Sequence, residues 1–131
     1  MRAWAAVAAV AAFGAAAEGI RTPLAAAGDA KRGREVVLSR EASCLLCHVV
    51  PGVEGRAMGD VGPSLAGVGS KLKAPELRLR IVDSSRINPK SVMPPYHRVE
   101  GLNAVARDLR GSPVLSSQQV EDVVAYLGTL K

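Results

Sequence analysis

Aromatic side chains are scarce in this chain of 131 residues, which holds one Trp, one Phe and two Tyr. The Trp and the Phe both fall within the first 13 positions, so the remainder has only Tyr96 and Tyr126. A small domain with so few large side chains has a thin hydrophobic core. A bulky apolar cofactor held covalently would make up for that shortage, although the composition alone does not indicate one.

No stretch of the chain concentrates charge of one sign, although 17 Lys and Arg outnumber 12 Asp and Glu. The basic residues are spread out, and no aromatic residues interleave with them. Nucleic-acid-binding domains typically gather basic and aromatic residues on one face. The sequence therefore indicates no nucleic-acid partner.

Long apolar runs are absent apart from residues 3–17, which are nearly all Ala and Val and follow the positive start formed by Met1 and Arg2. A helix needs about 20 apolar residues to cross a bilayer, so this run is too short. A short basic start, an apolar stretch and small residues before a cut are typical of a secretory signal peptide. An uncleaved N-terminal anchor is the alternative.

Two cleavage sites of the Ala-x-Ala type are available, ending at Ala17 and at Ala27. We favour Ala27, because it leaves the polar residues 18–22 in the segment before the cut. The sequence thus predicts a signal peptide over residues 1–27 and one mature domain over residues 28–131. That domain would be periplasmic and would not contact the membrane after cleavage.

The mature part shows helical periodicity and no alternating pattern long enough for a useful strand, so we expect an all-α domain. Asp29 can cap a first helix, and a proline opens a second helix over residues 75–82. A short helix is expected over residues 101–108. Ser116 and Gln119 form a capping box before the most regular helix. The apolar stripe of that helix comprises Val120, Val123, Val124, Leu127 and Leu130.

Two further details follow from the same patterns. Residues 62–69 hold too many glycines for a helix, so we expect a loop there. The apolar residues of the helix over residues 75–82 share one side, and Arg78 and Arg80 fall on the other. Both arginines are therefore expected to face water.

The chain has only two cysteines, Cys44 and Cys47, and His48 follows the second one directly. A structural zinc site needs four ligands, and beyond this cluster the sequence offers only His97. A redox dithiol of the thioredoxin type belongs in a βαβ context, which the surrounding sequence does not show. Neither a zinc site nor a thioredoxin-like dithiol therefore accounts well for the motif.

Cys-x-x-Cys-His is the attachment motif of haem c. Two thiols separated by two residues can reach the two vinyl groups on one edge of the porphyrin, and the next side chain then lies under the iron. The sequence therefore predicts one covalent haem c, attached at Cys44 and Cys47, with His48 as an iron ligand. With both thiols consumed no cysteine nucleophile remains, so we expect no catalytic residue in this chain. Apolar neighbours of the motif are expected to shield the haem from water: Leu45, Leu46, Val49, Val50 and Pro51.

Electron-carrying cytochromes commonly pair the histidine ligand with a methionine, which raises the reduction potential. Met58, Met93 and His97 are the candidates for this second iron ligand. We favour Met93, because the two prolines after it stiffen the chain and would hold a weak thioether ligand in place. Met58 lies too close to His48 in sequence to reach the opposite haem face easily. A lone histidine such as His97 is more often a surface or hydrogen-bonded residue than a ligand.

The loop at Gly62 and Pro63 has a predicted supporting role. Its carbonyl groups are expected to accept a hydrogen bond from the far ring nitrogen of His48 and so fix the imidazole tautomer. An ordinary turn proline at this position is the alternative.

With these residues placed, the chain resembles a class I cytochrome c. The resemblance is carried by the Cys-Leu-Leu-Cys-His motif at 44–48, Gly-Pro-Ser-Leu at 62–65, Met-Pro at 93–94 and Val-Val-Ala-Tyr-Leu at 123–127. In that family the first and last helices cross, with a glycine and an aromatic residue at the contact. Gly33 and Tyr126 match those two roles.

Residues 80–102, together with residues 118–127, are more specifically similar to the SoxX family of cytochromes. The specific runs are Arg-Ile-Val-Asp at 80–83, Asn-Pro at 88–89, Val-Met-Pro-Pro-Tyr at 92–96 and Glu-Gly-Leu at 100–102. Members of that family are the small mono-haem subunits of SoxAX complexes in bacterial thiosulfate oxidation. The resemblance extends over residues 28–131.

The SoxX resemblance implies ligation of the iron by His48 and Met93. It implies a SoxA-like cytochrome subunit with one or two haems as partner, whose haem with a sulfur ligand carries the catalysis. The assembled complex would act as an L-cysteine S-thiosulfotransferase that joins thiosulfate to a cysteine of a SoxYZ-like carrier protein. A soluble cytochrome c would accept the electrons.

Two alternatives remain at this point. The first is a free-standing periplasmic electron-carrier cytochrome c unrelated to sulfur oxidation. The second is an exported dithiol oxidoreductase that uses Cys44 and Cys47 directly.

Overall fold

Helices are the only regular structure in the computed structural model, which describes residues 19–131. This confirms the predicted all-α class. Residues 1–18, and with them most of the predicted signal peptide, lie outside the described part. No helix within residues 19–131 has the length and apolar character needed to cross a membrane. The α-helices are α1 (Ala30–Leu38), α2 (Val68–Lys71), α3 (Ala74–Asp83) and α4 (Ser117–Thr129), and the 3₁₀ turns are η1 (Cys44–Leu46), η2 (Ser84–Arg86) and η3 (Arg107–Leu109).

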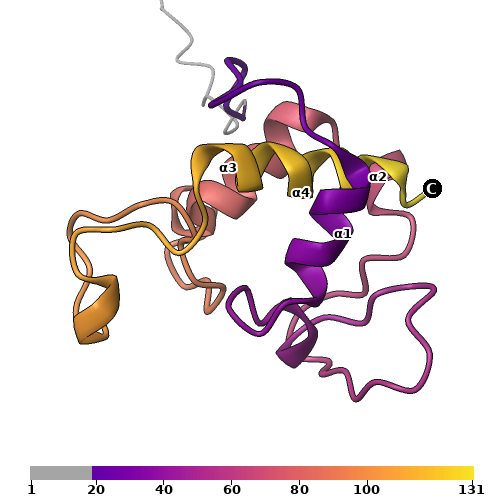
Figure 1. Ribbon diagram of the computed structural model, residues 1–131, viewed down its shortest axis with the longest axis horizontal. Helices are drawn as coiled ribbons and strands as arrows, with labels where there is room; N and C mark the ends of the chain where they lie inside the picture. The colour runs from indigo at the N-terminus through magenta and orange to yellow at the C-terminus, as the bar shows by residue number, and fades with distance from the viewer. Residues whose placement is uncertain (1–18) are drawn as a thin grey trace, which may run out of the picture.

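Helix α1 crosses α4 at a glycine (Figure 1). The side chain of Asp29 caps α1 by accepting a hydrogen bond from the Arg32 amide at 2.8 Å. At Gly33 a Cβ atom would overlap the Asp122 carbonyl oxygen and lie 2.9 Å from Cβ of Tyr126. The absence of a side chain therefore allows the two helices to touch, as the pairing of Gly33 with Tyr126 predicts.

Helix α4 is the central element of the core, and its predicted start is confirmed. Ser116 Oγ accepts a hydrogen bond from the Gln119 amide at 3.2 Å, and the Gln119 side chain accepts one from the Ser116 amide at 2.9 Å. This capping box satisfies two amides that the first helical turn would otherwise leave unpaired. Four residues of the predicted stripe are buried in the core: Val120, Val123, Val124 and Leu127.

Helix α3 extends one residue beyond the predicted range at each end, and one expectation about its polar face is wrong. Arg78 is only 4% exposed, and its guanidinium donates to both carboxylate oxygens of Glu121 on α4, at 2.7 and 2.8 Å. Arg80 is only partly exposed and lines a cavity together with Leu77 and Ile81, so it does not simply face water either. An arginine can be buried when a carboxylate pairs with it in this bidentate way.

The segment over residues 19–28 lies against α3 and α4 (Figure 1). The carbonyl oxygen of Ile20 accepts a hydrogen bond from Arg78 at 2.6 Å, and the amide of Leu24 donates to Glu121 at 2.9 Å. Gly28 meets the backbone of Glu121 so closely that a Cβ atom would overlap its carbonyl. The segment therefore completes the hydrogen bonding of the buried ion pair.

The predicted helix over residues 101–108 is wrong apart from the 3₁₀ turn η3 at its end. Gly101 and Ala104 both have positive φ, +66° and +53°, which interrupts a right-handed helix. The chain instead projects from the domain as a loop over residues 98–114, which we call the projecting loop (Figure 1). The other expected loop, over residues 62–69, is confirmed except that α2 begins at Val68.

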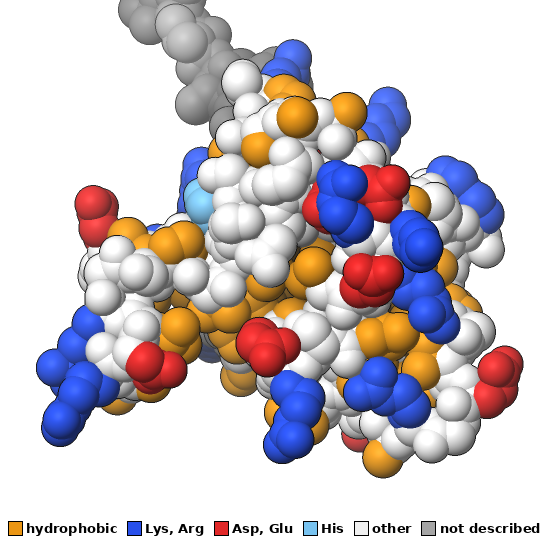
Figure 2. Space-filling view, viewed as in Figure 1, with side chains coloured by type: hydrophobic (Ala, Val, Ile, Leu, Met, Phe, Trp, Pro, Cys, Tyr) orange, Lys and Arg blue, Asp and Glu red, His pale blue; other side chains and the backbone are white. Residues whose placement is uncertain are grey.

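Charged side chains of both signs are interspersed on the face shown in Figure 2. Lys and Arg gather most clearly on the projecting loop and along the opposite side, with Asp and Glu between them. Apolar surface shows between these charges near the middle of the view.

Candidate functional site

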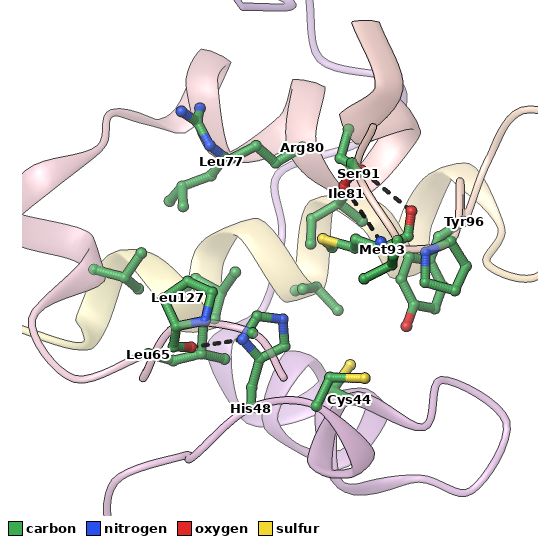
Figure 3. Close-up of a pocket in the computed structure, with 18 of the residues that line it drawn as sticks. Cys44, His48, Leu65, Leu77, Arg80, Ile81, Ser91, Met93, Tyr96 and Leu127 are labelled. Atoms are coloured by element: carbon green, nitrogen blue, oxygen red, sulfur yellow. Dashed lines mark hydrogen bonds between the residues drawn. The ribbon is translucent and has the colours of Figure 1, made fainter. Parts of the chain in front are cut away.

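A cavity of about 480 Å³ opens between the Cys-x-x-Cys-His loop, α3, α4 and the chain after α3 (Figure 3). Its interior is predominantly apolar, and all four α-helices contribute residues to the wall. The aliphatic lining residues are Val37, Val61, Leu65, Val68, Leu72, Leu77, Ile81, Ile87, Val92, Val123 and Leu127. A cavity of this kind favours a large apolar ligand and excludes water around it.

The turn η1 places Cys44 and Cys47 at the edge of this cavity. The amides of Cys47 and His48 both donate to the Cys44 carbonyl, at 3.2 and 3.0 Å, which winds the motif into one tight turn. The two thiols are free and not joined in a disulfide. Burial raises the pKa of the Cys44 thiol, so it is held neutral. The thiols are therefore available for attachment of a group inside the cavity.

The imidazole of His48 is oriented by the loop that the sequence singled out. Its Nδ1 lies 2.7 Å from the Pro63 carbonyl oxygen, which confirms the predicted contact (Figure 3). A carbonyl can only accept, so Nδ1 donates and Nε2 keeps its lone pair free for a metal. The ring lies against Gly62, where a Cβ atom would overlap its Cε1 atom. The loop therefore fixes both the tautomer and the position of the ring.

Met93 enters the cavity from a different wall, on the chain that follows α3 (Figure 3). Its backbone is tied to the start of that chain through two serine hydroxyl groups, Ser84 and Ser91. The cavity thus brings together all four residues that the sequence selected: Cys44, Cys47, His48 and Met93.

The two other candidates for the second ligand point elsewhere. The sulfur of Met58 accepts a hydrogen bond from the Val50 amide at 3.3 Å, outside the cavity lining. His97 places Nδ1 at 2.8 Å from the Leu115 carbonyl and Nε2 at 3.4 Å from the Ser117 hydroxyl. Both side chains have structural partners, so only Met93 of the three faces His48 in one cavity.

The apolar neighbours of the motif do not line the cavity, contrary to expectation. Leu45 and Val50 pack into the core behind it, whereas Leu46 is 72% exposed and Val49 is exposed as well. The tight turn of η1 directs these side chains away from the thiols. The walls come instead from Val37 and from residues between Val61 and Leu127, which lie 13 or more positions after His48. Their sequence signals were the apolar sides predicted for the helices that became α3 and α4.

The donor set fits a haem c. Two free thiols, an imidazole with Nε2 available and a thioether face an apolar cavity, which is the combination that covalent attachment and His/Met ligation require. Within residues 19–131, no group of three or more His, Cys, Asp or Glu side chains is close enough to hold a metal ion by itself. The apolar lining together with this donor set suits a metal that is carried inside a macrocycle.

Comparisons with known proteins agree with this geometry. The family model described as "Cytochrome c" matches residues 30–131. A solved structure, SoxXA from P. pantotrophus, aligns with a TM-score of 0.78 at 28% sequence identity. The alignment covers 87% of this chain and 90% of that one. No curated protein matches the chain.

Proposed function

The chain belongs to the cytochrome c family and carries one covalent haem c, and on this premise we propose that it is the electron-transfer subunit of a SoxAX-type complex. The observation that carries the proposal is the likeness to SoxXA over 87% of the chain. The Cys-x-x-Cys-His motif alone would not separate this role from that of any other mono-haem cytochrome.

The proposed site has a simple division of roles. Cys44 and Cys47 would hold the macrocycle as thioethers, and Nε2 of His48 and the sulfur of Met93 would be the ligands of the iron. The haem c held by these residues would supply a one-electron redox couple. Pro63 holds the His48 ring in the ligating tautomer through the 2.7 Å hydrogen bond to Nδ1. The apolar walls keep water from the group.

The reaction assigned to the complex divides between subunits. A bond between a thiosulfate sulfur and the sulfur of a carrier cysteine forms with loss of two electrons, so the reaction needs an electron outlet. This chain has no cysteine besides the two attachment residues, and so it offers no thiol for sulfur chemistry. We therefore place that chemistry on a SoxA-like cytochrome subunit with one or two haems, and the electron outlet on this chain. A soluble cytochrome c in the periplasm would accept the electrons from this chain.

The mouth of the cavity suits a protein partner. Val61, Ile87 and Val92 line the cavity and are also exposed, Val92 by 78%. Exposed apolar side chains grouped around one opening are typical of a docking surface. A partner seated there would lie against the cavity that is proposed to hold the redox group.

The test is to purify the complex from native periplasm and to identify co-eluting proteins by mass and haem stain. We expect a second haem-bearing subunit, and reduction of the haem by thiosulfate when a carrier thiol is present. A lone monomer that ignores thiosulfate would favour a free-standing electron carrier instead.

A matched pair of variants locates the partner surface. Val92→Asp places a charge at the cavity mouth and should weaken co-elution of the second subunit. Leu46→Asp changes a similarly exposed residue, 72% against 78%, that does not line the cavity. It should leave co-elution unchanged.

A further inference from the structure

Two serine hydroxyl groups bind both backbone polar groups of Met93. The amide of Met93 lies 3.3 Å from Ser91 Oγ, and its carbonyl oxygen lies 3.2 Å from Ser84 Oγ. The two hydroxyl oxygens are 2.8 Å apart. Met93 is thus the only residue of the chain over 87–95 whose amide and carbonyl are both held by these side chains.

The direction of each bond follows from counting protons. The Met93 carbonyl can only accept, so Ser84 donates its single hydroxyl proton to that carbonyl. The bond between the two hydroxyls must then be donated by Ser91. Ser91 in turn accepts from the Met93 amide. The result is a closed circuit, from the Met93 amide through Ser91 and Ser84 back to the Met93 carbonyl, in which each hydroxyl donates once and accepts once.

The circuit links Met93 to a rigid element. Ser84 is 7% exposed and stands where α3 ends and η2 begins. The chain over residues 87–95 has no helix or strand of its own. Both serines also line the cavity, and Figure 3 shows Ser91 beside Met93. Hydrogen bonds that are linked in series polarise one another, so the loss of one bond weakens the others.

We propose that the Ser84–Ser91 pair is a positioning device that holds Met93 in place as an iron ligand; this rests on the proposed ligation by Met93. A thioether is a weak ligand, so the iron–sulfur bond persists only if the Met93 segment has little freedom to move away from the iron. The circuit ties the Met93 backbone to the end of α3 and so limits that movement. Without it, a competing small ligand reaches the iron more easily.

The experiment compares holoprotein variants Ser84→Ala, Ser91→Ala and the double variant. The readouts are the dissociation constant of the oxidised protein for imidazole, which competes with Met93, and the far-red absorption band of the iron–thioether bond. We expect each single variant to bind imidazole about ten-fold more tightly and to lose part of the band, because each opens the circuit. The double variant should resemble either single variant, since an open circuit has little more to lose.

Ser85→Ala is the matched control. The Ser85 hydroxyl donates to the Asp83 carboxylate and is outside the circuit. Its removal should leave imidazole binding and the far-red band unchanged. Ser84→Thr keeps a hydroxyl and should restore most of the wild-type affinity. If the buried Ser84→Ala variant fails to fold, the partly buried Ser91→Ala variant tests the positioning role by itself.

Met93→Ala, measured in parallel, separates ligation of the iron by Met93 from the positioning role of the two serines. If Met93→Ala abolishes the far-red band while the serine variants bind imidazole as the wild type does, the positioning role is overturned and the ligation stands. Additive effects of the two serine variants would overturn the closed circuit. An unchanged band in Met93→Ala would remove the ligation itself, and the positioning role with it.

Discussion

Arg78 of α3 and Glu121 of α4 form a bidentate ion pair in which each side chain is only 5% exposed. The segment before α1 supplies further hydrogen-bond partners: the Ile20 carbonyl accepts from Arg78, and the Leu24 amide donates to Glu121. Burial disfavours the charged carboxylate, but the hydrogen bonds from Arg78 and Leu24 outweigh it and lower the pKa of Glu121. Three parts of the chain thus meet at one charged contact.

Breaking this ion pair should destabilise the domain. Arg78→Met leaves a buried carboxylate without its partner, and we expect a loss of about 3 kcal/mol in the free energy of unfolding. Urea unfolding of the holoprotein measures it. Replacing both residues by Met should recover a large part of the loss, because no unpaired charge remains. Arg34→Met, at an exposed position of α1, is the control. A loss in Arg78→Met no larger than in the control would contradict the role of the pair.

The acid stability of the domain should depend on Asp122. Hydrogen bonding from the Arg32 guanidinium, joined by the Asp29 amide, lowers the pKa of Asp122 from 3.8 to about 2 despite its burial. A carboxylate with a depressed folded-state pKa stabilises the protein above its unfolded value, and this stability is lost as the pH falls through the folded value. The wild type should therefore lose stability between about pH 4 and pH 2.

Asp122→Asn tests that dependence. The variant should be less stable at neutral pH and should show a flatter decline across the same pH window, as followed by thermal unfolding at each pH. Asp108→Asn, at an exposed position of the projecting loop, should leave the profile unchanged. Parallel profiles for the wild type and Asp122→Asn would contradict the assignment.

The contact of α1 with α4 should not tolerate a methyl group at Gly33. The added Cβ would overlap the Asp122 carbonyl, so Gly33→Ala must push the helices apart. We expect a loss of about 2 kcal/mol in the free energy of unfolding. Gly128→Ala is the matched control, because a Cβ there meets nothing within 4 Å. That variant should be neutral or slightly stabilised, since alanine favours a helix over glycine. Equal stability of the two variants would argue against a close contact at Gly33.

We expect the proposed signal peptide to be cut after Ala17 and not after Ala27, so that the mature chain retains residues 19–27. A cut after Ala27 would remove the partners that Ile20 and Leu24 give to the buried ion pair, whereas a cut after Ala17 would leave them in place. The intact mass of the protein from the periplasm distinguishes the two sites. A chain expressed from Gly28 onward should unfold at a lower denaturant concentration than one expressed from Glu18. A native N-terminus at Gly28 would show that the domain does without these contacts.

Features that depend on near neighbours could be predicted from the sequence. The capping box at Ser116 and Gln119 joins residues three positions apart, and the turn from Cys44 to His48 is equally local. The Pro63 contact with His48 spans 15 positions and could be predicted because haem-binding histidines need an acceptor for their far nitrogen. Such signals sufficed to define the class of the fold and the four candidate site residues.

Features that depend on distant partners could not. Arg78 looked like a solvent-facing residue because its partners, Glu121 and Ile20, lie 43 and 58 positions away. Periodicity identifies the polar face of a helix, but it does not show that a carboxylate of another helix contacts that face. The Ser84–Ser91 circuit was missed for a different reason. Its members lie within nine positions of one another, but serines in a turn-rich stretch are usually no more than turn formers.

The projecting loop leaves and re-enters the domain at adjoining points. At its base the Leu115 amide donates to the Tyr96 carbonyl at 2.9 Å, and Nδ1 of His97 donates to the Leu115 carbonyl at 2.8 Å. With both ends fastened together there, the length of chain between them does not affect the distance from Met93 to α4. Insertions or deletions near the tip of this loop, over residues 103–112, should therefore leave the cavity unaltered.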